Sequence, residues 1–177
     1  MNAPTAELVL PSARLQKSFL AAMEEFTAEG RYGDETMIGR DMGRFGPTWH
    51  TPEGFAELLS KLEAVRYTPP QANFVCSTTW WWAEGDEFIG RIAIRHELNE
   101  RLLEWGGHIG YDVRSSRRRE GHATRMLAAA LPEARKLGIA RVLITCEPAN
   151  LASRKVIEAN GGVFEDQRGD RLRFWIG

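Results

Sequence analysis

Residues 117–124 of the sequence, "RRREGHAT", combine residue types that bind an anionic group. Three arginines precede Gly121 and Ala123, and a helix-like run, "TRMLAAALPEARKLG", follows directly. The start of a helix carries partial positive charge, so additional cations there are unfavourable unless an anion neutralises them. The free N–H groups of a first helical turn bind phosphate, small residues let it approach, and arginine adds charge-assisted bonds. The pattern predicts that a pyrophosphate occupies this helix end.

Two other kinds of site are excluded by the motifs. The sequence contains no G-x-x-x-x-G-K-[ST] and no G-x-G-x-x-G after a strand, which are the common phosphate-binding loops. Its four histidines share no metal-ligand spacing with one another or with the two cysteines, so no metal is expected.

The elements that must position this loop follow from hydrophobic periodicity and from turn residues. Apolar residues at helical spacing after Ser12 predict a first helix, and Thr51 and Pro52 begin a second one after a Gly-rich loop over 31–47. The predicted helices cover residues 12–30, 51–67, about 121–137 and 152–160. The predicted strands cover residues 7–11, 73–83, 87–98, 107–114, 140–146, 163–167 and 171–176. This order predicts an α/β fold, with helices flanking a central mixed β-sheet.

The composition is that of one soluble globular domain. With 177 residues, 43% of them hydrophobic and 27% charged, the chain is long enough for one buried core and short for two, so residues 1–177 are expected to form a single domain. No stretch approaches the roughly 20 apolar residues of a membrane span, and no secretory signal is recognisable at the start. Only two cysteines occur, so a cytoplasmic location without membrane attachment is expected.

The charge is distributed unevenly along the chain. From residue 111 onward 13 Lys and Arg stand against 8 Asp and Glu, whereas residues 1–110 carry 10 and 16. The basic part indicates an anionic ligand, and the acidic part would attract a cation. The isoelectric point of 6.4 and the net charge of −1 argue against nucleic acid as a partner.

The loop and its surroundings resemble a known family. The run 109–127, "IGYDVRSSRRREGHATRML", is similar to motif A of the GNAT superfamily of N-acetyltransferases, whose signature is [QR]-x-x-G-x-[GA]. Arg118, Gly121 and Ala123 occupy its three defined positions. The run 150–162, "NLASRKVIEANGG", resembles motif B of the family. The order of strands and helices also fits this fold over nearly the whole chain, with a cofactor-binding core at about residues 107–162.

What the resemblance implies is a binding site for acetyl-CoA as a cosubstrate. By that likeness the backbone of Val113 and of the following Arg114 would pair with the pantetheine arm. Asn150 and Ser153 would contact the cofactor near its sulfur-bearing arm. The pyrophosphate would be held by Arg118, Arg119, Glu120, Gly121, His122, Ala123 and Thr124.

The implied reaction is direct attack of a substrate amine on the acetyl thioester in a ternary complex. An alkyl ammonium with a pKa of about 10.4 is only about a thousandth deprotonated at neutral pH, so a base or desolvation must remove its proton. Among the candidates His96, His108, Glu104 and Glu147, we favour Glu147 and His96 as catalytic residues. His108 lies five residues before Val113, whereas family members with a base on this strand place it at an even spacing.

The acid that protonates the departing thiolate is not assigned by the resemblance. Many family members carry a tyrosine in the motif B helix, and Ile157 occupies that position here. Tyr111 or a water molecule could substitute, or the thiolate could leave unassisted, because a thiol of pKa about 8.5 is a fair leaving group. Cys146 has no partner base at a recognised spacing, and burial is the commoner use of a cysteine.

The acceptor is expected to be a primary amine of a small molecule. Carboxylates in the first helix and the following loop would attract it: Glu24, Glu25, Glu29, Asp34, Glu35 and Asp41. The rings of Trp80–Trp82 must point to both faces of their strand, so core packing is favoured over an aromatic wall of an acceptor cleft. Two other functions stay open, a non-catalytic acyl-CoA-binding module and a nucleic-acid-binding protein, and so does pairing of the chain into a homodimer.

Overall fold

The computed structural model describes residues 5–177 as an α/β arrangement of two antiparallel sheets and six α-helices. The strands are β1 (Glu7–Val9), β2 (Ser77–Glu84), β3 (Glu87–Arg95), β4 (Ile109–Val113), β5 (Val142–Cys146), β6 (Val163–Arg168) and β7 (Arg171–Ile176). The helices are α1 (Gln16–Ala28), α2 (Met37–Phe45), α3 (Pro52–Ala64), α4 (Glu100–Glu104), α5 (His122–Lys136) and α6 (Leu151–Ala159), with single 3-10 turns at Ala13–Leu15 (η1) and Ser115–Arg117 (η2).

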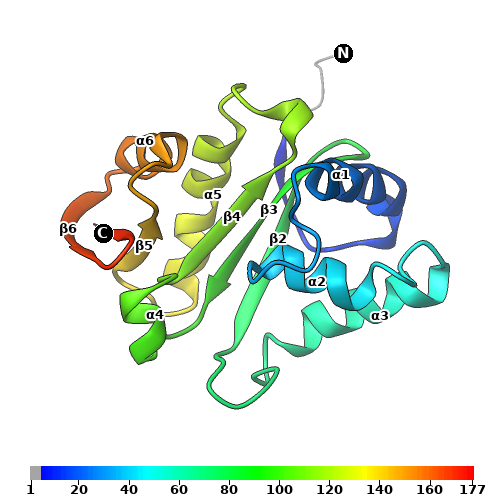
Figure 1. Cartoon of the computed structure of the whole chain (residues 1–177), viewed down its shortest axis with the longest axis horizontal. Coiled ribbons are helices and arrows are strands. Elements are labelled where there is room, and N and C mark those ends of the chain that lie inside the picture. Colours follow the sequence, from blue (N-terminus) through cyan, green and yellow to red (C-terminus); the bar gives the residue numbers. More distant parts are fainter. Residues whose placement is uncertain (1–4) are drawn as a thin grey trace.

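The strands divide between a sheet of order β1-β2-β3-β4 and a sheet of order β5-β7-β6. The sheets meet at the start of β4, where Gly107 forms a bridge with Ile144 and the His108 N–H donates to the Leu143 carbonyl at 2.7 Å. Beyond this point no ladder joins β4 to β5 within residues 5–177, and the two strands diverge (Figure 1). The predicted α/β class is therefore confirmed, although the sheet divides into two antiparallel parts instead of forming one mixed sheet.

A glycine at the start of β4 lets the two sheets approach. Gly107 has φ 60°, and a Cβ there would lie 2.4 Å from the Leu143 carbonyl oxygen. Such a contact is far inside van der Waals distance, so a side chain at this position would push β4 away from β5. The place where the sheets join, and hence the place where they begin to separate, depends on this glycine.

Two hydrophobic cores lie on opposite faces of the first sheet. Figure 1 shows α1, α2 and α3 grouped on one side and α5 on the other. On the α1 side Phe19 stacks on Trp81 at 4.9 Å between ring centroids. On the α5 side Trp82 belongs to the second core with Met126 and Leu127. Trp81 and Trp82 are both buried, at 1% and 3% exposure, so the preference for core packing of the tryptophan run is confirmed.

Two helices form where the sequence predicts none. The segment Met37–Phe45 is helical because the Thr36 hydroxyl accepts a hydrogen bond from the Gly39 N–H at 3.1 Å and because Met42 and Phe45 are buried. Two glycines within this helix give it a low intrinsic helix propensity, so the sequence alone does not predict it. The short α4 begins at Asn99, whose side chain caps it through the Leu102 N–H at 2.9 Å.

Candidate functional site

The loop between β4 and α5 ends in two residues with left-handed backbone. Arg119 has φ 64° and Gly121 has φ 76°. Gly121 is the N-cap of α5, and in the described structure no side chain caps the first turn. The N–H groups of this turn, which includes His122, Ala123 and Thr124, are therefore directed outward without the usual side-chain acceptor. This geometry suits an anion, and the exposed Arg119 beside it has no carboxylate within 4.0 Å in residues 5–177.

The neighbouring arginines are already neutralised inside the protein. The Arg118 Nε–H donates to the Val113 carbonyl at 2.9 Å, and its guanidinium group forms an ion pair with Glu29 of α1. Arg117 turns toward the β2–β3 hairpin and pairs with Glu84, Glu87 and Glu120. Two of the three arginines thus have carboxylate partners inside the protein, and a contact of Arg118 with the pyrophosphate stays a prediction. Arg118 ties the loop to α1, and only Arg119 keeps an unpaired charge among the three.

Arg114 is part of the scaffold. Its N–H donates to the Ile89 carbonyl at 2.9 Å, and its own carbonyl accepts from the Arg117 N–H at 3.1 Å. Arg114 is 9% exposed, and its guanidinium group donates hydrogen bonds to Glu25 at 2.9 Å and to the Phe88 carbonyl at 3.1 Å. The Arg114 backbone is thus already paired with β3 and with the following turn, and its contact with the pantetheine arm stays a prediction.

Glu25 holds the η2 turn against α1. Its carboxylate accepts hydrogen bonds from Arg114, from the Ser115 hydroxyl at 3.0 Å and from the Ser116 N–H at 3.0 Å. Burial disfavours the charged form, but the bonds from Arg114 and the two serines outweigh it and lower the pKa of Glu25 to about 2. The carboxylate thus stays ionised and fixes the segment that leads from β4 into the loop.

The edge of β4 that faces β5 carries free backbone groups. Antiparallel pairing with β3 uses the groups of alternate residues, as the bond from the Arg114 N–H to Ile89 shows. The same alternation directs the N–H and C=O groups of Ile109, Tyr111 and Val113 to the opposite edge, into the divergence between β4 and β5, where the Val113 carbonyl already accepts from Arg118. An extended chain with amide groups, such as a pantetheine arm, can pair with this edge as an added strand does.

The first turn of α6 approaches the same edge. The Tyr111 hydroxyl and the Ser153 hydroxyl are 2.8 Å apart, and the Asn150 side chain caps α6 by accepting from the Ser153 N–H at 3.1 Å. Burial raises the pKa of Tyr111 to about 12 despite the bond with Ser153. Asn150 and Ser153 are thus brought beside β4, where the resemblance places them.

His122 and Glu120 contribute to this loop in different ways. His122 is 3% exposed, and its Nδ1 accepts from the Trp82 Nε1–H at 3.1 Å. Its proton is therefore on Nε2, which lies 3.2 Å from the exposed Glu120 carboxylate. The ring anchors the start of α5, so a cofactor can meet only the His122 backbone.

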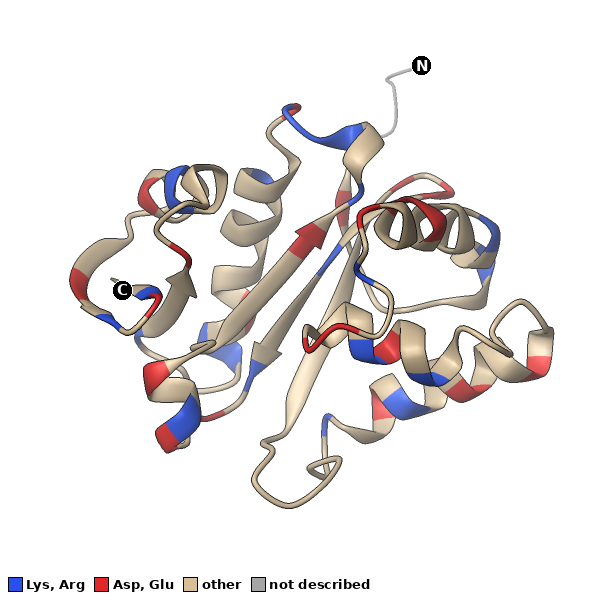
Figure 2. Cartoon of the chain, in the orientation of Figure 1, with Lys and Arg blue, Asp and Glu red and all other residues tan. Residues whose placement is uncertain are grey.

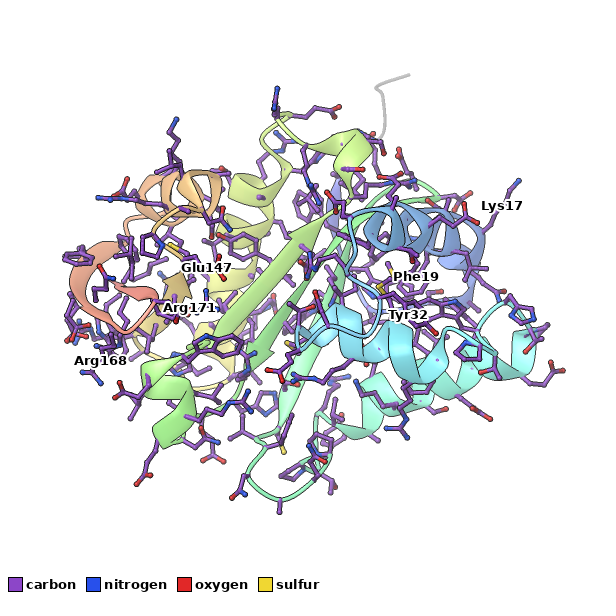
Figure 3. The ribbon with its side chains drawn as sticks, in the orientation of Figure 1. Lys17, Phe19, Tyr32, Glu147, Arg168 and Arg171 are labelled. Atoms are coloured by element: carbon purple, nitrogen blue, oxygen red, sulfur yellow. The ribbon has the colours of Figure 1, made fainter. Side chains whose placement is uncertain are left out.

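The two residues favoured as bases lie on different sheets. Glu147 follows β5, where β4 and β5 separate, and its carboxylate accepts from Arg171 Nη1 at 2.9 Å; Figure 3 shows both residues on the β5–β7 side. His96 follows β3, and its Nε2 lies 2.8 Å from the Thr78 hydroxyl. Burial, together with the charge of Arg66, lowers the pKa of His96, which favours the neutral ring that a base requires.

Three further residues that the sequence singles out, His108, Cys146 and Ile157, have structural roles. The His108 Nδ1 accepts from the Leu143 N–H at 2.9 Å, and burial together with Arg95 lowers the pKa of His108 to about 4. Cys146 is buried, which raises the pKa of its thiol and disfavours a nucleophilic thiolate. Ile157 is fully buried in the α5-side core.

The carboxylates expected to attract an amine are largely neutralised. Figure 2 shows acidic stretches of α1 near the basic segment that follows β4. Glu25 and Glu29 pair with Arg114 and Arg118, and Asp34 pairs with Arg31 at 2.9 Å. The prediction of a cation-attracting surface from this part of the sequence is therefore wrong for the paired carboxylates.

A cavity of about 250 Å³ opens on the α1–α3 face of the first sheet. It lies between α2, α3, α4 and the loop before β2. Met37 lines it, and the Met37 sulfur is 4.0 Å from where a Cβ of Gly110 on β4 would lie. Trp105 also lines it, and the Arg171 guanidinium lies 4.6 Å from the Trp105 ring centroid.

None of the residues predicted for the cofactor lines this cavity. No motif of the sequence indicates the cavity, although the "WGGH" run at 105–108 signals the close approach of strands beside it.

A family model described as an acetyltransferase (GNAT) domain matches residues 24–163. The chain belongs to the GNAT acetyltransferase family. It is an acetyl-CoA-dependent acetyltransferase, and acetyl-CoA is its cosubstrate. None of the curated protein sequences with which the chain was compared is significantly similar to it.

Solved structures share the fold at low sequence identity. RimJ of Mycobacterium smegmatis, in complex with CoA-disulfide, has a TM-score of 0.64 and 20% identity over 97% of this chain and 81% of its own. RimL, a ribosomal L7/L12 alpha-N-protein acetyltransferase in complex with coenzyme A, has a TM-score of 0.65 and 17% identity over 97% and 93%. The microcin C7 self-immunity acetyltransferase MccE, in complex with acetyl-CoA and AMP, has a TM-score of 0.65 and 10% identity over 98% and 92%.

Residues 5–177 lack a membrane-spanning helix and a cluster of metal ligands. None of the helices there is long and apolar enough to cross a membrane. The same residues contain no group of three or more His, Cys, Asp or Glu side chains arranged to hold a metal ion.

Replacement of Glu25 by glutamine is expected to remove pH-dependent stability. The pKa of Glu25 is about 2 in the folded protein against 4.5 as the ordinary value, so its contribution is present above pH 4.5 and is lost as the pH falls toward 2. Glu25→Gln should lower the free energy of unfolding at pH 7 by about 2–3 kcal/mol, and the difference from the unaltered protein should vanish in acid.

Urea denaturation at several pH values measures this difference. Glu24→Gln is the control, because Glu24 is the exposed neighbour on the same helix. Equal effects of the two substitutions at every pH would contradict the role of Glu25.

Proposed function

We propose that this acetyltransferase transfers the acetyl group to a primary amine of a small molecule, by direct attack in a ternary complex. The observation that carries the proposal is the cavity of about 250 Å³, which approaches β4 at Gly110 and is lined by none of the predicted cofactor residues. A separate and small compartment next to the central strand allows acceptor and cosubstrate to be bound at the same time.

The proposed cosubstrate site follows the free edge of β4 to the start of α5. The backbone of Val113 pairs with the pantetheine arm through its N–H, because its carbonyl accepts from Arg118. The first-turn N–H groups from Gly121 to Thr124 bind the pyrophosphate. Arg119 supplies the unpaired charge, whereas Arg118 holds the loop in place through Glu29. Asn150 and Ser153 meet the sulfur-bearing arm from the α6 side.

The proposed chemistry uses groups at the point where β4 and β5 diverge. The amine nitrogen attacks the thioester carbon, and the N–H groups on the free edge of β4 donate to the oxyanion that develops there. Glu147 takes the proton from the amine, directly or through water, because its carboxylate lies at this divergence and is exposed. His96 is the alternative base; its lowered pKa favours the neutral ring, but it does not line the cavity.

Tyr111 is suited to stabilise the departing thiolate as a hydrogen-bond donor. With a pKa of about 12 it keeps its proton, and it would not transfer it to a thiolate whose conjugate acid has a pKa of about 8.5. Its hydroxyl is linked to the Ser153 hydroxyl at 2.8 Å; one of the two donates to the other, so the pair keeps one proton that can be donated to the sulfur. The thiolate thus leaves without a general acid, which agrees with an isoleucine at position 157.

The experiment that tests the proposal follows thiol release from acetyl-CoA across small amines and across short peptides with free N-termini. Turnover of small amines at rates above those of the peptides is expected. RimL, which shares the fold, is described as a ribosomal L7/L12 alpha-N-protein acetyltransferase. Faster turnover of peptides would therefore replace the small-molecule acceptor by a protein N-terminus. Tight CoA binding without release for any amine would favour a non-catalytic acyl-CoA-binding protein.

Gly121→Trp is expected to abolish CoA binding, because the indole would fill the space before the first turn of α5. Gly138→Trp is the matched control: Gly138 also has a positive φ, at 83°, and lies in open space at the other end of α5. Calorimetric titration with CoA measures the affinity, and far-UV circular dichroism confirms the fold. Equal CoA affinity of the two variants would contradict the pyrophosphate site.

Glu147→Gln is expected to lower kcat by about 10²–10⁴, because the uncharged amide cannot accept the proton of the amine. Glu158→Gln is the control, since Glu158 is a half-exposed carboxylate on α6 that pairs with Arg154. The measurement is thiol release with the best acceptor from the screen. An unchanged kcat in Glu147→Gln would transfer the role of base to His96 or to solvent.

A further inference from the structure

The cavity next to β4 is strongly basic. Its lining contains one carboxylate, Asp41, and five basic side chains, which are Arg40, Arg44, Lys61, Arg95 and Arg101. These residues come from α2, α3, the end of β3 and α4, which are distant in the sequence and are brought together by the fold (Figures 1 and 2).

The single carboxylate is fully engaged. Asp41 is 5% exposed; its Oδ1 accepts from Lys61 Nζ at 2.6 Å and its Oδ2 from Arg91 Nη1 at 3.0 Å. Burial disfavours its charged form, but Arg91 and Lys61 outweigh this effect and lower the pKa of Asp41. Asp41 thus neutralises Lys61 and Arg91 at most in part, and it has no oxygen left for the other cations. Arg91, itself 5% exposed, keeps a buried Nη2 without a hydrogen-bond partner.

The four remaining arginines have no anionic partner in the described chain. None of them has a carboxylate within 4.0 Å in residues 5–177. Arg40, Arg44 and Arg101 lie over aromatic rings, at 5.5 Å from Phe74, 5.0 Å from Phe45 and 5.6 Å from Trp105.

Of these four arginines, Arg95 has the least favourable environment for its positive charge. It donates to the carbonyls of Gly106 and Gly107 at 3.2 and 3.0 Å, and these are neutral acceptors. Burial, followed by repulsion from Arg40, Arg101 and Arg91, lowers the pKa of Arg95 to about 10. An unpaired and partly buried guanidinium group such as that of Arg95 is costly unless a ligand supplies the opposite charge, whereas Arg40, Arg44 and Arg101 are exposed and accessible to such a ligand.

We propose that this cavity binds an oxyanion, a carboxylate or a phosphate, carried by the acceptor at the end opposite its amine. The proposal rests on the proposed function, and it names the substrate class of that function: a small amine that also bears an anion. Guanidinium groups bind both oxyanions through paired N–H donors, and the cavity size fits a molecule of a few carbon atoms.

The position of the cavity supports this orientation of the acceptor. Met37 of the cavity wall lies next to Gly110 of β4. On another side of the cavity, Trp105 contacts the guanidinium group of Arg171, which also pairs with Glu147. An anion held among Arg40, Arg95 and Arg101 therefore leaves the amine end free to extend toward β4 and the proposed base.

The test compares matched acceptors that differ only in the anion. One pair is 3-aminopropanoate and 3-aminopropanamide, and the other is 2-aminoethyl phosphate and 2-aminoethanol. The anionic member of at least one pair should have a kcat/KM at least about tenfold higher, since one hydrogen bond to a charged group contributes this much. The pair with the larger ratio identifies carboxylate or phosphate.

Two charge-removing variants locate the effect in the cavity. Arg40→Gln and Arg101→Gln should each raise the KM for the anionic acceptor by about tenfold, with kcat and the KM for its neutral partner little changed. Arg141→Gln is the control, because Arg141 is exposed, lies between α5 and β5 and is not part of the cavity lining.

The outcomes distinguish failure of the oxyanion-binding cavity from failure of the proposed acetyltransferase function. A preference for anionic acceptors that is lost in Arg40→Gln and Arg101→Gln but kept in Arg141→Gln supports the inference. Equal use of neutral and anionic amines, or a preference that the two variants leave intact, overturns the inference and leaves the proposed function standing. Absence of thiol release with every amine, while acetyl-CoA binds, overturns the proposed function and the inference together.

Discussion

The separation of β4 from β5 is the constraint on which the rest of the site depends. The two strands touch where Gly107 allows the Leu143 carbonyl to approach, and beyond that point each follows its own sheet. A strand that loses its neighbour keeps a row of unpaired N–H and C=O groups, which are costly to leave unsatisfied when they are shielded from water. In this enzyme that row lies between the starts of α5 and α6, and in the proposed cosubstrate site it is the template for an extended, amide-containing ligand.

The charges near this edge serve mainly to hold the protein together. Glu25 and Glu29 of α1 bind Arg114 and Arg118, which follow β4 by one and five residues, and these pairs fix the loop against the opposite face of the sheet. The ligand-binding groups that remain are backbone N–H groups, whose direction is set by the left-handed turn at Gly121. Such a site is preorganised, because the groups that would bind phosphate cannot rotate as side chains do.

The sequence predicts the parts of this site that depend on local rules. The glycine before a helix and the long α5 are local features, and each lies where the sequence places it. The cap of α6 by Asn150 is local as well, although the sequence predicts only a helix there and not its cap. The direction of Arg114 could not be predicted, because its partner Glu25 is 89 residues away. The same applies to α2, whose stability comes from burial of Met42 and Phe45 against distant segments and not from helix propensity.

The sign of the charge around the acceptor shows most clearly why composition misleads. Residues 1–110 are acidic overall, and on that basis they predict a surface for cations. Folding pairs most of the relevant carboxylates with arginines and collects unpaired Arg40, Arg95 and Arg101 around one cavity. Electrostatic potential depends on which charges remain after pairing, and their positions are properties of the tertiary structure. Because like charges also disfavour the protonated form of a nearby amine, a cationic cavity beside β4 would assist the deprotonation that direct attack on the thioester requires.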